Sequence, residues 1–251
     1  MSIGLSLLLT PLLHLSPAPA RSQDNSFFDP PSRGAPKRTA TAGSRGSCPV
    51  YGEQQPVTIL VPGNDPKDKT VTIAASTVAE YPTFLWYIPQ FSGLNQLGFT
   101  LLDDHTGEMI YQTILPLPDR AGVMTLKLPE SQPPLKVGRW YHWVLSVSQS
   151  EDPQTVFSSP CFAEAYIGRR PLNSAQQQEL NESAINLTDI WNFYAQEIIW
   201  YDALATLDQL RRQNPTDSSI NRKWQATLGL VGLADLSEYP PVNEVEMAQP
   251  E

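Results

Sequence analysis

The sequence predicts an α+β fold, in which an N-terminal antiparallel β-sandwich, immunoglobulin-like in outline, is followed by an α-helical hairpin that packs on it. Between residues 57 and 167, short runs of β-branched and aromatic residues recur at regular spacing, bounded by Pro, Gly, Asn or Asp. From about residue 173 the apolar residues adopt the three-and-four spacing of a helix. We therefore divide the chain into a signal peptide (1–20), a Pro/Gly/Arg-rich arm (21–47), the sandwich (48–170), a helical segment (171–235) and a flexible acidic tail (236–251).

Residues 1–20 have the features of a secretory signal peptide. Ile3–Leu15 is a Leu-rich apolar run too short to span a bilayer as a helix, and Ala18-Pro19-Ala20 offers the small residues that signal peptidase requires. No Lys or Arg precedes the run and Pro19 lies inside the cleavage box, so an N-terminal anchor or a wrongly chosen start stays open. We expect export to the periplasm or the exterior, with no transmembrane segment in the mature chain.

The chain is acidic, with a formal net charge of −9. Nucleic acids and anionic membranes bind basic surfaces, so we expect neither as a partner. Positive charge is concentrated in the arm, where Arg33 and Arg45 are candidate interaction residues. The arm is either a solvated, flexible segment or one held along the domain, with its arginines facing the acidic remainder.

The chain has two cysteines, Cys48 and Cys161. In an exported protein they are expected to pair, and closing so long a loop stabilises the folded state by roughly 4–5 kcal/mol in the chain-entropy model. A catalytic or redox thiol is the alternative, but the sequence has no CxxC motif.

The sandwich is expected to contain about eight strands, because runs of this type at this spacing are typical of sandwiches and barrels. The expected strands are Val57–Val61, Thr70–Ala74, Thr83–Ile88, Leu97–Leu102, Glu108–Leu115, Val123–Leu128, Trp140–Val147 and Cys161–Ile167.

Strand alternation assigns the aromatic residues to faces. Phe84, Trp86 and Ile88 share one face, with Leu85 and Tyr87 on the other. In the later strand, a row of apolar side chains faces inward and Trp140 and His142 face outward; the inward row is Tyr141, Trp143, Leu145 and Val147. The outward pair is a candidate binding platform, unless Trp140 is covered by the helical segment.

No motif identifies a catalytic, cofactor or metal site. Asp103–Gly107 is predicted to be a hairpin turn. A metal site is the less favoured interpretation, because the segment lacks the ligand spacing of a calcium loop and no second histidine is nearby. His105 and His142 are the only histidines beyond residue 20, and no nucleophile elbow, zinc, P-loop or dinucleotide motif occurs. Two carboxylates distant in sequence could still form a hydrolytic pair.

The helical segment predicts one long helix from Leu187 to Arg212, capped by Asn186 or Thr188 and ended by Asn214-Pro215. A second helix, capped by Asp217 or Ser218, runs to about Val231, and a weaker helix covers 174–185. The long pair resembles a single tetratricopeptide-type hairpin. One such unit needs another surface on which to pack, and the β-domain provides it.

Four motifs in order resemble an exported cyanobacterial family, domain of unknown function 928. They are PPSRGAPKRTATAGSRGSC, YPTFLWYIP, RWYHWVLSV and YAQEIIWYDALATLDQLRRQNP. The resemblance covers roughly residues 27–233 and implies no reaction. Two departures matter: the family's glycine run is here Thr41–Ser44, and the second cysteine, expected near Ser148, is Cys161. The disulfide survives this relocation if the strands flanking 148–160 form a hairpin.

Two functions follow as hypotheses. The first is a non-catalytic protein-interaction or structural module of the cell envelope, with an unknown protein partner there. The alternative is a carbohydrate-binding module that uses exposed tryptophans such as Trp140 or Trp86.

Overall fold

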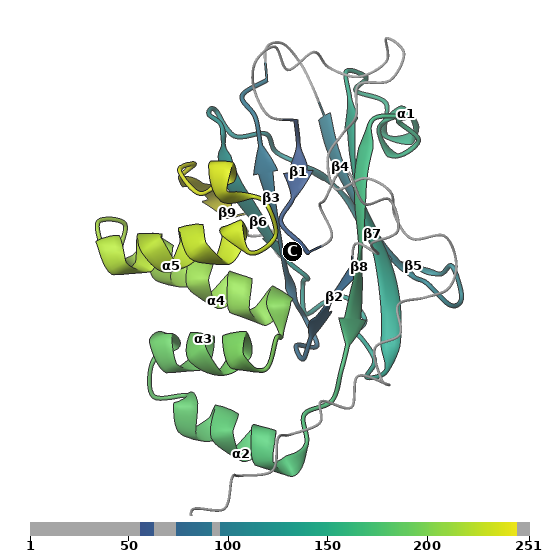
Figure 1. Cartoon of the computed structure of the whole chain (residues 1–251). Helices are drawn as coiled ribbons and strands as arrows, with labels where there is room; N and C mark the ends of the chain where they lie inside the picture. Colours follow the sequence, from purple (N-terminus) through teal and green to yellow (C-terminus); the bar gives the residue numbers. More distant parts are fainter. Residues whose placement is uncertain (1–55, 63–73, 92–95, 245–251) are drawn as a thin grey trace, which may run out of the picture.

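The computed structural model describes residues 56–62, 74–91 and 96–244, which form two β-sheets and a layer of helices (Figure 1). In chain order the elements are β1 (Thr58–Ile59), β2 (Ala74–Thr77), β3 (Thr83–Ile88), β4 (Gln96–Asp103), β5 (Met109–Leu115), β6 (Gly122–Lys127), β7 (Arg139–Ser148), α1 (Pro153–Phe157), β8 (Phe162–Arg169), α2 (Ser174–Ser183), α3 (Leu187–Gln196), α4 (Trp200–Gln213), α5 (Ser218–Gly229), η2 (Ala234–Leu236) and β9 (Pro241–Glu244). The predicted signal peptide and arm lie outside the described residues. Within the described ranges, no helix has both the length and the apolar character that crossing a membrane requires.

The strands form a four-stranded sheet in the order β1-β3-β6-β9 and a five-stranded sheet in the order β2-β8-β7-β4-β5. Most neighbours are antiparallel, as expected, but β2 pairs with β8 and β6 pairs with β9 in parallel. The purely antiparallel prediction is therefore wrong at two edges. A parallel pair needs a long crossover, and here the crossovers run through other strands or through the helices. The immunoglobulin-like outline stays a prediction.

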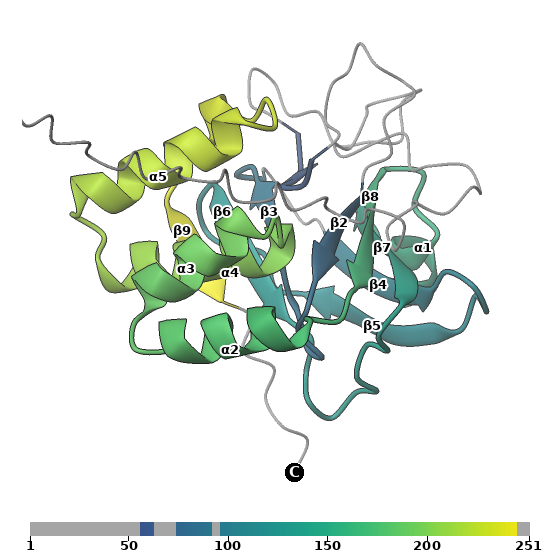
Figure 2. The ribbon, with the colours of Figure 1, turned by 60° about the horizontal axis from the view of Figure 1, so that its bottom comes forward.

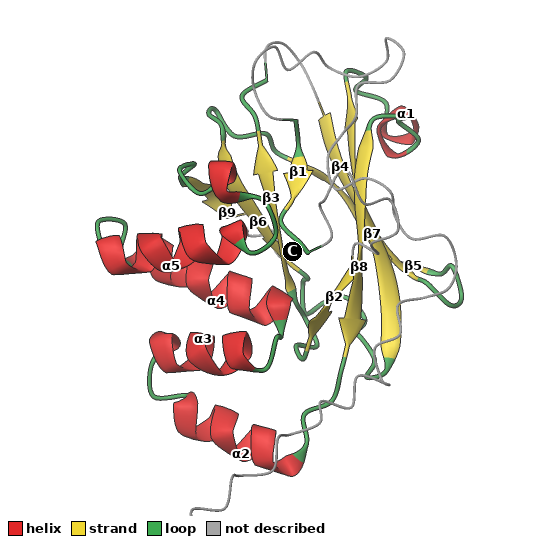
Figure 3. Cartoon of the chain, in the orientation of Figure 1, coloured by secondary structure: helices red, strands yellow, loops and turns green. Residues whose placement is uncertain are grey.

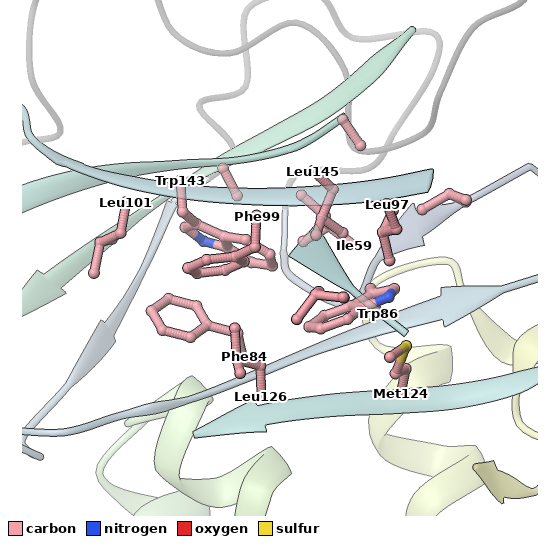
Figure 4. Close-up of a cluster of buried hydrophobic side chains, with 14 of the residues drawn as sticks. Ile59, Phe84, Trp86, Leu97, Phe99, Leu101, Met124, Leu126, Trp143 and Leu145 are labelled. Atoms are coloured by element: carbon pink, nitrogen blue, oxygen red, sulfur yellow. The ribbon is translucent and has the colours of Figure 1, made fainter. Parts of the chain in front are cut away.

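The first core lies between the two sheets, where aromatic side chains from β3, β4 and β7 point toward one another (Figure 4). The Phe84 ring lies 5.0 Å from Phe99 and 4.9 Å from Trp143, both with tilted planes. Aromatic pairs at this separation contribute beyond the apolar area they bury. Trp86 lies within this core with no exposed surface. The hypothesis that Trp86 is an exposed saccharide platform is therefore wrong, because strand alternation turns its indole toward the opposite sheet.

A second core lies on the other face of the four-stranded sheet, against α4 and α5. Figure 2 shows helices α2 to α5 on this side of the sandwich, away from β4 and β5. Leu85 and Tyr87 of β3 are buried here, which confirms the predicted alternation of that strand. The helical side of this core includes Leu204, Leu207, Leu210, Ile220, Trp224 and Leu228. The helical segment therefore packs on the sandwich.

Helices α2 to α5 lie side by side in chain order (Figure 3). The predicted single helix from Leu187 to Arg212 is wrong, because α3 ends at Gln196 and α4 begins at Trp200. Ile198 between them has a positive φ of 55° and is 64% exposed, while Ile199 is fully buried. Because of the break, the first turn of α4 points into the sandwich. The contacts that it makes there outweigh the helical hydrogen bonds that a continuous helix would form. At the other ends, Asn186 caps α3 and Asp217 caps α5, as two of the predicted caps require.

Replacing Ile198 by glycine is expected to stabilise the protein by about 1 kcal/mol, because a β-branched residue is strained at positive φ and glycine is not. Little apolar burial is lost, since the side chain is mostly exposed. Urea unfolding of Ile198→Gly measures the gain, and Ile185→Gly, at an exposed position after α2, is the control for glycine itself. A destabilised Ile198→Gly protein would contradict the strain argument.

The first turn of α4 is fixed to both sheets by three consecutive side chains. Trp200 Nε1 donates to the Leu60 carbonyl at 2.9 Å, and Asp202 Oδ2 accepts from the Val78 backbone N–H at 3.2 Å. The Tyr201 hydroxyl accepts from Trp143 Nε1 at 2.8 Å and donates to the Tyr166 carbonyl at 3.1 Å. The Trp-Tyr-Asp motif is thus the joint between the helices and the sandwich.

Burial raises the pKa of Asp202 to about 6, although hydrogen bonds to the end of β2 act in the opposite direction. The residue keeps some exposed surface, but its carboxylate packs against Thr77 and Val78. Because the folded pKa exceeds the unfolded one, the folded state binds more protons between about pH 4 and pH 6, and stability falls as pH rises through that window. Asp202→Asn keeps an oxygen acceptor for the Val78 N–H and removes this titration.

We expect the unfolding free energy of the native protein to fall by about 1–2 kcal/mol relative to Asp202→Asn between pH 4 and pH 7. Urea unfolding at several pH values measures the difference. Subtracting the two curves removes the contribution of the other carboxyl groups. Parallel curves would show that Asp202 titrates normally.

Residues 241–244 were expected to belong to a flexible acidic tail, but they form the strand β9. Val123 donates its N–H to the Pro240 carbonyl at 2.8 Å, and Arg212 Nη1 donates to the Val242 carbonyl at 2.8 Å. Gly122 permits this approach, because a Cβ there would lie 2.3 Å from a Val242 methyl carbon. Short, proline-containing strands are weak sequence signals, and the partners that hold this one lie far away in the sequence.

Candidate functional site

The structure brings two of the four candidate interaction residues together. Arg33 and Arg45 lie outside the described residues, as does Cys48. Trp140 and His142 lie on the outer face of β7, where their partners on β8 are Gly168 and Tyr166. Cys161 is fully buried beside Val147 at the mouth of the β7–β8 hairpin, whose existence confirms the expected pairing of these strands.

The outer-face pair is packed against neighbouring strands. The Trp140 indole lies over Gly168, since a Cβ at Gly168 would be 3.0 Å from three ring carbons. His142 Nε2 lies 3.0 Å from Glu164 Oε2, and the His142 ring is 5.0 Å from that of Tyr166. Burial, and then the carboxylates of Asp104 and Glu164, raise the pKa of Tyr166 to about 12. Nothing in this set places a nucleophile beside a base.

A second feature is a recess of about 940 Å³ between α4, α5 and the segment that leads into β9. Figures 1 and 2 both show β9 close to these helices. Four arginines line it, and we call it the arginine groove: Arg120 precedes β6, Arg211 and Arg212 end α4, and Arg222 lies on α5. Pro215, Pro240 and Pro241 form part of its walls.

One face of α5 supplies a polar wall of the arginine groove. Ser218, Asn221, Arg222 and Gln225 all line the recess, and because Asn221 and Arg222 follow Ser218 by three and four residues and precede Gln225 by four and three, the set shares one side of the helix. The opposite side carries Ile220, Trp224 and Leu228 into the second core. The two faces of α5 are therefore divided between packing and the groove.

Arg211 and Arg212 share the buried carboxylate of Asp208. Arg212 Nε donates to Asp208 Oδ2 at 2.6 Å, and Arg211 Nη1 lies 3.9 Å from Asp208 Oδ1. Glu238 is the one acidic residue among the described lining residues. Because the groove has four arginines and these two carboxylates, its own net charge is positive, although the net charge of the whole chain is −9.

Arg211 forms the floor of the groove. Its residue is 6% exposed, and its guanidinium carbon lies 4.2 Å above the Trp224 ring. Burial lowers its pKa to about 10, although Asp208 acts in the opposite direction. Nη2 donates to the Tyr239 carbonyl at 3.0 Å, but Nε and Nη1 have no hydrogen-bond acceptor among the described residues. These two nitrogens have almost no exposed surface, so Arg211 acts on a ligand in the groove through its positive charge.

Arg120 and Arg222 lie exposed at the rim. Arg222 Nη1 donates to Ser218 Oγ at 3.3 Å, whereas Arg120 forms no hydrogen bond or ion pair with a described residue. Both guanidinium groups are therefore available to a ligand. Planar guanidinium groups bind carboxylates and phosphates through two parallel hydrogen bonds.

Sequence reasoning missed the arginine groove. Arg211 and Arg212 lie at the end of the predicted long helix, where the helix dipole favours cations, and this position does not distinguish a binding residue from a structural one. Arg120 and Arg222 lie far apart in the sequence, and only the fold brings them to one recess. The polar spacing along α5 was the one available signal.

The family model for Domain of Unknown Function (DUF928) matches residues 40–241. The chain belongs to this family. No curated protein matches the sequence of this chain. The match includes every element from β1 to the first residue of β9 and therefore all the residues of the arginine groove, and the family description names no reaction or ligand.

Proposed function

We propose that this DUF928 protein is an exported, non-catalytic interaction module of the cell envelope, and that the arginine groove is its contact site for a protein partner. The observation that carries the proposal is the groove itself. It is a recess lined by four arginines and one glutamate, formed where α4 ends and α5 begins beside the segment that leads into β9. Clefts of this kind concentrate and orient oppositely charged groups.

A binding role is also favoured by how the most perturbed groups are used. Burial raises the pKa of Tyr201 and Asp202, and both side chains fix α4 to the sandwich. Burial lowers the pKa of Arg211, a change that leaves it charged at neutral pH. These shifts accompany packing and anion attraction rather than proton transfer.

Affinity capture from a native envelope fraction tests the proposal. The double variant Arg120→Glu/Arg222→Glu reverses two exposed charges at the groove and is expected to lose proteins that the native chain retains. Lys127→Glu/Lys136→Glu makes an equal change of charge at the last residue of β6 and in the segment before β7, where both side chains are exposed, and is expected to retain these proteins. Identical captured sets from the native protein and the groove variant would reject the groove as the contact site.

Export and a Cys48–Cys161 disulfide are part of this proposal. Their support is the signal-like N-terminal sequence, the complete burial of Cys161 and the lack of a free cysteine among the described residues. A thiol assay on denatured protein from the natural host should detect none before reduction and two after it. Intact-mass measurement of the same sample locates the mature N-terminus; reactive thiols or an uncleaved chain would contradict these assignments.

Carbohydrate binding is the second candidate, and the position of Trp140 favours it. The indole lies flat over Gly168 on the outer face of a sheet, and flat aromatic rings are suited to stacking on sugars. Acrylamide quenching of tryptophan fluorescence tests this. A saccharide that protects the native protein, but not Trp140→Phe, would support it, whereas equal quenching with and without envelope polysaccharides would reject it.

A further inference from the structure

We propose that the arginine groove receives an extended, acidic polypeptide segment of the partner, with Asp or Glu carboxylates bound by the arginines. This inference rests on the proposed function and specifies the chemistry of the same site. Three properties of the groove lead to it, namely its charge, its shape and its other polar groups.

Charge selects an anion. The rim carries Arg120 and Arg222, which are exposed, and the floor carries the buried positive charge of Arg211. The floor charge is held by stacking on Trp224 and by Asp208, so it does not turn away when no ligand is bound. Preorganised cations of this kind lose little conformational entropy on binding.

Shape selects a chain rather than a membrane surface. The positive groups line a recess bounded by Pro215, Pro240 and Pro241, whereas a bilayer contacts basic groups that protrude. The described lining residues include no aromatic side chain, which is the usual stacking surface for a sugar ring. A narrow, flexible polyanion therefore enters such a recess more readily than the headgroups of a membrane or a sugar ring that needs an aromatic side chain to stack on.

The remaining polar groups suit a peptide backbone. Asn221 and Gln225 line the groove one turn apart on α5, and each side-chain amide both donates and accepts hydrogen bonds. Thr216 and Ser218 add hydroxyl groups at the start of the same helix. An extended peptide presents alternating N–H and C=O groups that amides and hydroxyls can satisfy, while its side-chain carboxylates reach the arginines.

Fluorescence anisotropy with two short labelled peptides, one of alternating Glu and Gly and one of alternating Gln and Gly, tests the inference at low ionic strength. The native protein is expected to bind the Glu peptide and not the Gln peptide, and added salt is expected to weaken the binding. Arg120→Gln/Arg222→Gln is expected to weaken it by roughly five- to tenfold. Lys127→Gln/Lys136→Gln, with the same change in net charge, should remain within about twofold of the native value.

Three results would overturn the inference. Equal binding of the Glu and Gln peptides would remove the role of the carboxylates, and equal weakening by both double variants would reduce the effect to net charge. Displacement of the Glu peptide by oligogalacturonate at a lower concentration than by unlabelled peptide would assign the groove to an acidic saccharide. Envelope capture separates a failure of this inference from a failure of the proposed function. If capture depends on the groove but the protein shows no preference for the Glu peptide, the proposed function stands and this inference fails. If the groove variant captures the same proteins as the native chain, the proposed function is rejected even if the Glu peptide binds.

Discussion

Trp224→Ala is expected to lower the free energy of unfolding by about 3–5 kcal/mol, because truncating a buried tryptophan removes apolar burial and leaves a cavity. Trp224 has no exposed surface and lies in the second core, between α5, α4 and the four-stranded sheet. Its Nε1 has no hydrogen-bond acceptor among the described residues, so no hydrogen bond is lost with it. The effect comes from lost packing and from the lost contact of the ring with the Arg211 guanidinium.

The same substitution acts on the arginine groove, since the guanidinium of Arg211 stacks on this ring at 4.2 Å. Without the ring, the floor of the groove loses its support, and we expect Glu-peptide binding to fall even where the protein remains folded. Trp224→Phe retains an aromatic face and should recover much of both properties.

Urea unfolding followed by circular dichroism measures the stability change. Trp191→Ala is the matched control, because Trp191 is only partly buried and its ring also contacts a cation, Lys223 at 4.4 Å. We expect the control to lose about 1–2 kcal/mol. A Trp224→Ala protein as stable as Trp191→Ala would mean that the helical layer does not depend on this core.

Local patterns predicted the elements of the sandwich well, because each strand shows its inward and outward faces in its own residues. The alternation in β3 placed Phe84 and Trp86 in one core and Leu85 and Tyr87 in the other. Alternation does not show which strand lies next to which in a sheet. The parallel pairing of β6 with β9 depends on the small residue Gly122 and on Arg212, far apart in the sequence.

The break between α3 and α4 was not predictable from periodicity. The apolar spacing continues through Ile198 and Ile199, and no Gly or Pro marks the end of a helix. Local preference favours a continuous helix there, and tertiary hydrogen bonds of Trp200, Tyr201 and Asp202 override it. The arginine groove shares this origin, since charge becomes a site only after distant segments meet.

Tyr201→Phe is expected to destabilise the protein by about 2–3 kcal/mol, even though it removes a single oxygen, because it leaves a buried donor without an acceptor. The hydroxyl accepts from Trp143 Nε1 at 2.8 Å and donates to the Tyr166 carbonyl at 3.1 Å. Both partners lie in the five-stranded sheet, whereas Tyr201 belongs to α4. The substitution therefore weakens the joint between helices and sandwich while leaving the ring packing in place.

Tyr81→Phe makes the same chemical change at a partly buried residue whose hydroxyl has no hydrogen bond with a described residue, and should change stability by less than about 0.5 kcal/mol. A double-mutant cycle with Trp143→Phe isolates the hydrogen bond. In the Trp143→Phe background no indole N–H remains, so the loss caused by Tyr201→Phe should shrink by about 1 kcal/mol or more. Additive losses would show that the two side chains are not coupled, and the Trp-Tyr-Asp motif would then fix α4 mainly through Trp200 and Asp202.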